Sequence, residues 1–250
     1  MAEVQPFHGI RCNQAIVKDV EAVICPPYDI ITPQMEQELY TRNQYNFIRV
    51  EHARQLIQDS TMDNRYTRSA TTMEEWLKQG VLVTDAEPAI YIHDQYFIHK
   101  GKEHKRRCLV ARVRLEEWHR SIIRPHEGTL AEAKSDRLRL LWALKANTSP
   151  ILVMYEDQER YISSLLSAQE LGKPVINIDG YNVERHKVWA LTSPQVIQDI
   201  GGFFARKPLY IADGHHRYES ALNYQRDQHA IYSLVSEDDA FNYVMMSLVA

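Results

Sequence analysis

The chain has few cysteines, little net charge and no long apolar run, and each shortage excludes a class of protein. Its three cysteines, Cys12, Cys25 and Cys108, are odd in number and far apart, so they fit neither a disulfide framework nor a zinc knuckle. The formal net charge of −4 gives no general attraction for nucleic acid or an anionic membrane. No stretch reaches the length of a transmembrane helix, and the first residues lack the apolar core of a secretion signal. We therefore expect a cytoplasmic protein without a nucleic-acid or membrane partner.

The order of the predicted elements indicates an α+β or mixed α/β fold. Apolar runs predict strands at 45–51, 89–98, 107–115, 151–155, 175–178, 186–191, 209–212 and 243–250. Helical spacing and helix-start residues predict helices at 32–42, 64–79, 157–170, 193–201 and 215–228, and a further helix between residues 127 and 149. Because helices and strands interleave, we expect a mixed or antiparallel sheet in a single domain or in two closely packed lobes, with a boundary near 120–150. The chain ends inside an apolar strand, so we expect it to be the N-terminal part of a longer protein.

The stretch 208–219, Pro-Leu-Tyr-Ile-Ala-Asp-Gly-His-His-Arg-Tyr-Glu, predicts a strand, a glycine turn and a helix. This order points free backbone N–H groups at an anion. Arg217 adds a bidentate grip on phosphate, and His216 donates to a phosphoryl oxygen or moves a proton. The alternative is a helix capped by Asp213 with solvated histidines, although the helix dipole disfavours cations in a first turn. Zinc shared by His215 and His216 is disfavoured, since adjacent helical side chains point about 100° apart.

Two further loops place acids beside proline. The loop Arg124-Pro-His-Glu-Gly-Thr129 precedes a helix with Lys134 and Arg137, and its Glu127 is a candidate general base. The alternative for this loop is a polar turn in which Thr129 or Ser135 caps the next helix. The loop Cys25-Pro-Pro-Tyr-Asp29 offers a second acid, and its alternative is a rigid surface crossing.

The whole chain resembles a prokaryotic family, domain of unknown function 1015. The matching motifs, in order, are Cys25-Pro-Pro-Tyr-Asp29, Tyr45-Asn46 with Ile48-Arg49, Gly80-Val-Leu-Val83, Arg112-Val-Arg-Leu-Glu-Glu117, Pro125-His-Glu127 with Thr129, Asp136-Arg137, Ser149-Pro150 and Tyr210–Glu219. Members of that family are typically longer, which agrees with the expectation of a truncated chain.

The Asp-Gly-His-His-Arg box at 213–217 is similar to the phosphate-binding box of the ParB/sulfiredoxin-like superfamily. That resemblance implies a compact α+β core of that type, with the box at a helix N-terminus. Sulfiredoxins need a cysteine where this chain has Gly214-His215, and partition proteins need a helix-turn-helix module that is not recognisable here. Kinases of free serine carry the same string; in them the aspartate and histidines handle the transferred phosphate, and a separate acid near the N-terminus deprotonates the hydroxyl.

We therefore expect a small-molecule kinase that transfers a phosphoryl group from a nucleotide or inorganic polyphosphate to a hydroxyl such as that of free L-serine. Asp213 is expected to hold Mg²⁺ or orient the nucleophile, and either Glu127 or Asp29 to act as the base. The expected phosphate ligands are Gly214, His215, His216, Arg217, Lys134 and Arg137, and the expected substrate contacts are Tyr28, His126 and Thr129. The alternatives are a non-catalytic nucleotide-binding regulator and a phosphomonoester hydrolase.

Overall fold

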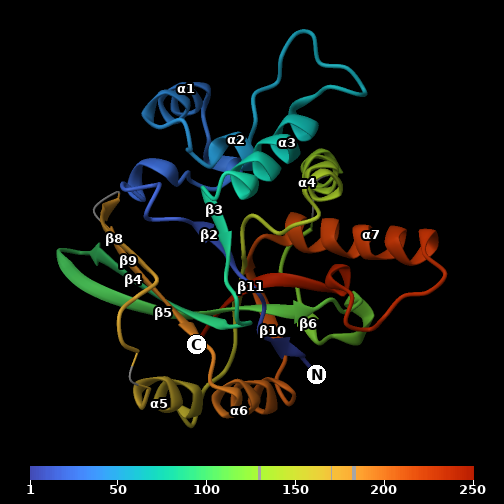
Figure 1. The fold of residues 1–250 in the computed structure, drawn as a ribbon. Helices are drawn as coiled ribbons and strands as arrows, with labels where there is room; N and C mark the ends of the chain where they lie inside the picture. Colours follow the sequence, from blue (N-terminus) through green and yellow to red (C-terminus); the bar gives the residue numbers. More distant parts are fainter. Residues whose placement is uncertain (129–130, 170, 182–183) are drawn as a thin grey trace. The chain divides into compact units, whose positions relative to one another are not determined.

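The computed structural model describes residues 1–128, 131–169, 171–181 and 184–250 (Figure 1). Contacts within the chain divide it into two compact units. Unit 1 comprises Met1–His8, Glu87–Leu138 and Pro150–Ala250, and unit 2 comprises Gly9–Ala86 and Arg139–Ser149. Helices and strands interleave along the described residues, which confirms the mixed α/β class. None of the described helices is long and apolar enough to cross a membrane.

Unit 1 is built on a nine-stranded mixed sheet. Along it the strands follow the order β6-β10-β7-β11-β5-β4-β9-β8, and β1 pairs with β5. The pairs β6–β10 and β7–β11 are parallel, and the other described pairs are antiparallel. The bounds are Val4–Gln5 (β1), Ile90–His99 (β4), Lys102–Arg114 (β5), Ile123–Arg124 (β6), Ile151–Met154 (β7), Ile176–Tyr181 (β8), Glu184–Leu191 (β9), Leu209–Asp213 (β10) and Tyr243–Val249 (β11).

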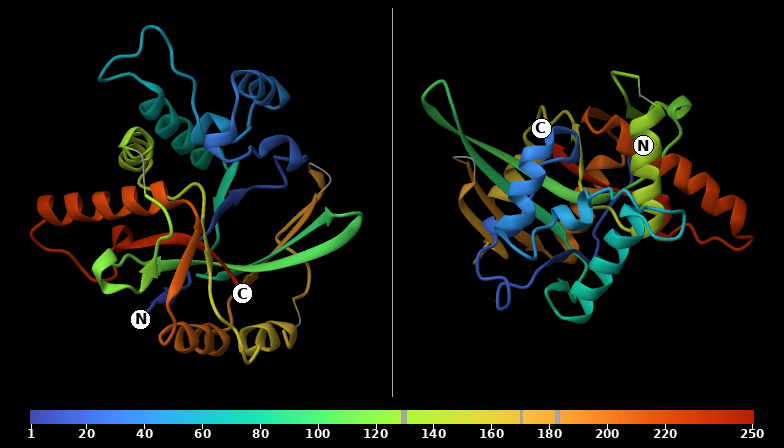
Figure 2. Two further views of the ribbon diagram at one scale, coloured as in Figure 1. Left: turned by 180° about the vertical axis from the view of Figure 1, so that it is seen from behind. Right: turned by 90° about the horizontal axis from the view of Figure 1, so that it is seen from above.

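Helices cover both sides of this sheet. The two short helices α5 (Tyr161–Ser167) and α6 (Pro194–Phe204) lie side by side along one side of it, and α7 (His215–Ile231) lies on the other (Figures 1 and 2). The central strands are accordingly buried: Ile151 and Val153 of β7 and Met246 and Leu248 of β11 are each 0% exposed. Helix α4 (Ala131–Leu144) begins in unit 1 and ends in unit 2.

Unit 2 consists of three helices, a two-stranded sheet and the end of α4. The helices are α1 (Pro33–Arg42), α2 (Ile48–Glu51) and α3 (Arg65–Lys78), and β2 (Ile10–Cys12) pairs antiparallel with β3 (Leu82–Thr84). Its core is a cluster of the buried residues Val17, Val23, Val50, Trp76, Val81 and Leu82.

Several local predictions are confirmed. Thr32 caps α1 by accepting from the amide of Met35, and Pro33 is its first residue. Lys100 and Gly101, with φ of 51° and 74°, form the tight turn of the β4–β5 hairpin. The apolar run near the end of the chain is the strand β11, hydrogen-bonded on both edges.

The prediction of a strand at 45–51 is wrong, because this segment ends in the short helix α2. Asn46 is 0% exposed, and its side-chain amide donates to the carbonyls of Ala22 and Ile24 at 2.9 and 3.0 Å. Its side-chain oxygen accepts from the amide of Ile48 at 3.0 Å. These bonds start a helical turn at Ile48, so tertiary contacts override the β propensity of the sequence.

Candidate functional site

The strand β10, Gly214 and helix α7 place the predicted box at the start of a helix of 17 residues. Leu209 and Ile211 of the strand are buried, whereas the Asp213 side chain at its end is 62% exposed. Gly214, the residue before the helix, lies in the left-handed region with φ of 97° and has no side chain that could cap the helix. The amides of a first helical turn have no partner within the helix, so this end of α7 is suited to bind an anion.

Arg217 folds back over the glycine turn. Its guanidinium donates from Nη1 to the carbonyl of Pro150 at 2.6 Å and from Nη2 to the carboxylate of Asp213. A Cβ added at Gly214 would lie 3.0 Å from Cζ, Nε and Nη2 of this guanidinium. Glycine is therefore required here both by the backbone angle and by the packed arginine. The result is a cation and a carboxylate held together at the open end of α7.

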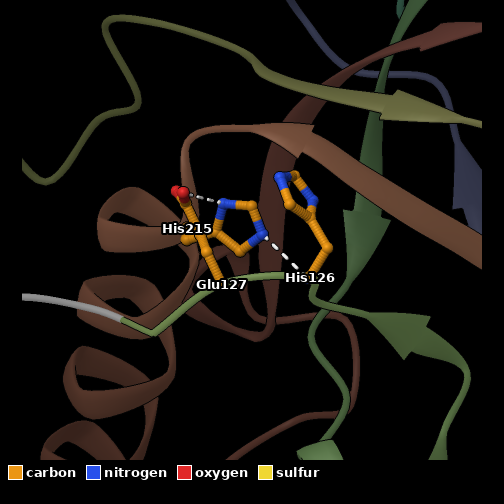
Figure 3. A group of neighbouring side chains, drawn as sticks. All are labelled: His126, Glu127 and His215. Atoms are coloured by element: carbon orange, nitrogen blue, oxygen red, sulfur yellow. Dashed lines mark hydrogen bonds and ion pairs between the residues drawn. The ribbon is translucent and has the colours of Figure 1, made fainter.

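His215 joins the box to the loop at 124–127. Its side chain is 1% exposed; Nε2 accepts the backbone N–H of His126 at 3.2 Å, and Nδ1 lies 2.9 Å from Oε1 of Glu127 (Figure 3). Because the amide of His126 occupies the lone pair of Nε2, the proton of the neutral ring is assigned to Nδ1, beside the Glu127 carboxylate. The Nδ1–Glu127 contact has the distance of an ion pair without the alignment of a hydrogen bond. Burial lowers the pKa of His215, and the carboxylate of Glu127 opposes that shift.

His126 is exposed, as Glu127 is. Its ring stands nearly perpendicular to that of His215, with centroids 4.5 Å apart and an interplanar angle of 86°. Nδ1 lies 2.7 Å from the carbonyl oxygen of Ile211, which accepts, so Nδ1 carries the proton. Nε2 is then the basic nitrogen of His126, held in a fixed orientation by the backbone of β10.

The side chains of His126, Glu127 and His215 offer ligand atoms within 4.8 Å of one another, which is compatible in distance with a metal ion. A neutral imidazole has one lone pair available in the plane of its ring. In His215 that lone pair is on Nε2, where it accepts the hydrogen bond from His126. A metal ion at Nδ1 would have to displace the proton on that atom. The hydrogen-bond pattern therefore favours a proton on Nδ1 of His215, beside Glu127, over a metal ion at that atom. Mg²⁺ fits Asp213 better, since that ion binds to one or two carboxylates together with waters and substrate phosphates.

A model of the family described as Protein of unknown function (DUF1015) matches residues 4–250. The chain belongs to this family. The match includes the box, the loop at 124–127 and the whole of unit 2, so all of the predicted site residues lie inside the family's domain. Searches among curated proteins and among solved structures give no significant match.

Of the remaining predicted site residues of this DUF1015 chain, some lie in the box or in α4, some lie in unit 2, and some are outside the described residues. His216 follows in the first turn of α7 and is half-buried. Arg137 is buried, and its guanidinium binds the carboxylate of the adjacent Asp136 with Nε at 2.8 Å. Thr129 and the side chain of Lys134 lie outside the described residues. Tyr28 and Asp29 form a single 3-10 turn in unit 2, where Asp29 is exposed, and their participation in the site stays a prediction.

Tyr218 supports the site of this DUF1015 chain and was not predicted from the sequence. It is 0% exposed, and its hydroxyl accepts from the amide of Glu116 at 2.9 Å and donates to the carbonyl of the same residue at 2.8 Å. Its ring packs on Trp118 with centroids 4.7 Å apart. The first turn of α7 is thereby anchored to a segment about one hundred residues earlier in the chain, a pairing for which the sequence carries no local signal.

Proposed function

We propose that this protein is a small-molecule kinase. The reaction takes place at the start of α7, where a phosphoryl group passes from a donor to the hydroxyl of a small substrate. The observation that carries the proposal is the meeting of two motifs at one helix end. His215 brings the acid Glu127 next to the N-terminus of α7, which also holds Arg217 and Asp213. Phosphoryl transfer depends mainly on positioning and on neutralising the charge of the phosphate, and this group of residues supplies both.

Each residue has a distinct role in the proposed reaction. The amides at the start of α7, Arg217 and His216 hold the phosphate of the donor. Glu127 takes the proton from the hydroxyl of the acceptor, whose oxygen forms a new bond to phosphorus while the bond from phosphorus to the departing phosphate oxygen breaks. Nδ1 of His215, 2.9 Å from Oε1 of Glu127, holds that carboxylate beside the start of α7. Mg²⁺ bound to the donor and to Asp213 would neutralise charge on the phosphates.

The resemblance of the box to that of the free-serine kinases supports L-serine as the acceptor and a ParB/sulfiredoxin-like core around β10 and α7. The donor is a nucleotide or inorganic polyphosphate. The acceptor and the type of core follow from the resemblance, and the donor follows from the chemistry of an anion site. All three are part of the proposal.

Phosphorus NMR tests the proposal. The protein is incubated with Mg²⁺ and with ATP, ADP, pyrophosphate or polyphosphate, with and without L-serine. Formation of O-phosphoserine supports the kinase, whereas phosphate release without an acceptor supports a phosphomonoester hydrolase, and tight donor binding without turnover supports a regulatory switch. Arg217→Ala is expected to weaken donor binding, while Asp213→Asn mainly lowers turnover; wild-type behaviour of both variants would make the box structural.

A further inference from the structure

A cavity lies within unit 2, and the proposed phosphoryl transfer does not use it. Its volume is about 800 Å³, within the range of pockets that hold small organic ligands. It is lined by the loop at 55–61, by the first turn of α3 with its cap Asn64, and by the face of α4 at 139–143. All of these segments belong to unit 2.

The loop wall of this cavity is held in place by Arg68 of α3. Its Nη1 lies 2.7 Å from Oδ1 of Asp59, and its Nη2 donates to the carbonyl of Arg54 at 2.7 Å. Asn64 caps α3 in a reciprocal capping box with Thr67, and its side-chain amide also donates to the carbonyls of Ser60 and Thr61. The loop and the helix therefore form one hydrogen-bonded wall, so the cavity is preformed.

The charged residues that line the cavity favour an anion. Arg65 and Arg139 contribute two positive charges, and Asp59 contributes a negative one. The carboxylate of Asp59 is already bound to Arg68, whose hydrogen bond lowers the pKa of Asp59. Arg139 is exposed, and no ion pair or hydrogen bond joins its side chain to another described residue. Its guanidinium is thus available for a phosphate or carboxylate.

The aromatic residues of the lining favour a flat ring next to that anion. Trp142 and Tyr66 both line the cavity, and the guanidinium of Arg65 lies 4.9 Å from the centre of the Tyr66 ring. Arg139 and Trp142 are three residues apart on α4, so they share one face of the helix. A cation beside an indole is a combination that binds planar ligands carrying negative charge. The polar side chains of Gln55 and Thr61 offer hydrogen bonds to a sugar.

We propose that this cavity binds a nucleotide, with the base against Trp142 and the phosphate at Arg139. The proposal is independent of phosphoryl transfer at α7, because none of the cavity's residues belongs to the box or to the loop at 124–127. A nucleotide bound here is a second ligand of the protein, separate from the phosphate donor.

Isothermal titration of the full chain with AMP, GMP, CMP and UMP, without Mg²⁺ and without an acceptor, tests this site. At least one of them is expected to bind in a 1:1 ratio and to change the tryptophan fluorescence. The corresponding nucleoside and inorganic phosphate are each expected to bind at least about tenfold more weakly, since each lacks one half of the recognition. Saturable binding of none of the four nucleotides, or equal binding of inorganic phosphate, would overturn the proposal.

Three variants locate the bound nucleotide. Arg139→Gln is expected to weaken binding by about tenfold or more, whereas Arg42→Gln, which removes an exposed arginine of the same unit outside the cavity, leaves it unchanged. Trp142→Phe is expected to abolish the fluorescence change while calorimetric binding persists. Arg217→Ala at the box must leave nucleotide binding intact. If Arg217→Ala removes binding and Arg139→Gln does not, the nucleotide sits at the box, which refutes this second site and leaves the proposed kinase standing.

Discussion

Replacing Gly214 by alanine tests the geometry of the glycine turn most sharply. A residue with a Cβ in the left-handed region costs about 1–2 kcal/mol. The new Cβ would also lie 3.0 Å from three atoms of the Arg217 guanidinium, which must shift by a few tenths of an ångström and thereby weaken its bond to the carbonyl of Pro150. A hydrogen bond from a charged donor contributes about 1.5–3 kcal/mol. The ion pair with Asp213 adds little, because the Asp213 side chain is 62% exposed and the pair is screened by solvent.

Since the arginine can find partial substitutes, we expect a total loss of roughly 2–4 kcal/mol for Gly214→Ala, and an apparent melting temperature roughly 5–15 °C lower. Urea unfolding measures the loss of free energy of unfolding, and differential scanning fluorimetry measures the melting temperature. Gly202→Ala is the matched control, because Gly202 lies in the last turn of α6 with no atom within 4 Å of an added Cβ and without a positive φ. That control is expected to be neutral or slightly stabilising. Equal stability of the Gly214 and Gly202 variants would refute the account of the turn.

Three further outcomes are expected. In His215→Ala, hydrogen exchange at the amide of His126 is expected to speed up at least tenfold, because that amide loses its acceptor; unchanged exchange would show that His215 does not hold the loop. Tyr218→Phe leaves the amide and carbonyl of Glu116 unsatisfied and is expected to cost about 1–3 kcal/mol in urea unfolding; a change below about 0.5 kcal/mol would contradict this. Burial lowers the pKa of His93 to about 4, so the unfolded chain binds its proton more readily. Stability is therefore expected to fall by up to about 3 kcal/mol as the pH drops from about 6.5 to 4, and His93→Gln should flatten that part of the pH profile.

Elements whose conformation is set by residues adjacent in the sequence were predictable from the sequence. The turn at Lys100-Gly101, the Thr32-Pro33 helix start and the strand–glycine–helix order at 209–215 follow from backbone preferences of the residues themselves. The segment at 45–51 was not predictable in this way. Its conformation is decided by the side chain of Asn46, whose partners lie more than twenty residues earlier.

The candidate site was predictable in its parts and not in its assembly. The sequence indicates the box at 213–217 and, separately, an acid at Glu127. Their meeting depends on the parallel pairing of β6 with β10, which places Arg124 opposite Tyr210, and on the burial of His215. The pairing of strands far apart in sequence leaves no local pattern. The carbonyls of Pro150 and Ile211 accept hydrogen bonds from Arg217 and His126. They are backbone groups, so the residue types at these positions do not reveal the contacts.

The most direct test of phosphoryl transfer at the start of α7 is a phosphorus NMR time course with donor, Mg²⁺ and L-serine. Wild-type protein and the Glu127→Gln and Asp213→Asn variants are compared, with Glu237→Gln, a change at an exposed acid outside the box and outside the loop at 124–127, as the control. We expect O-phosphoserine from the wild type and from the control, and at least a hundredfold slower formation from the two site variants. Equal rates in all four proteins, or no phosphorylated product from the wild type with any donor, would contradict the proposed function.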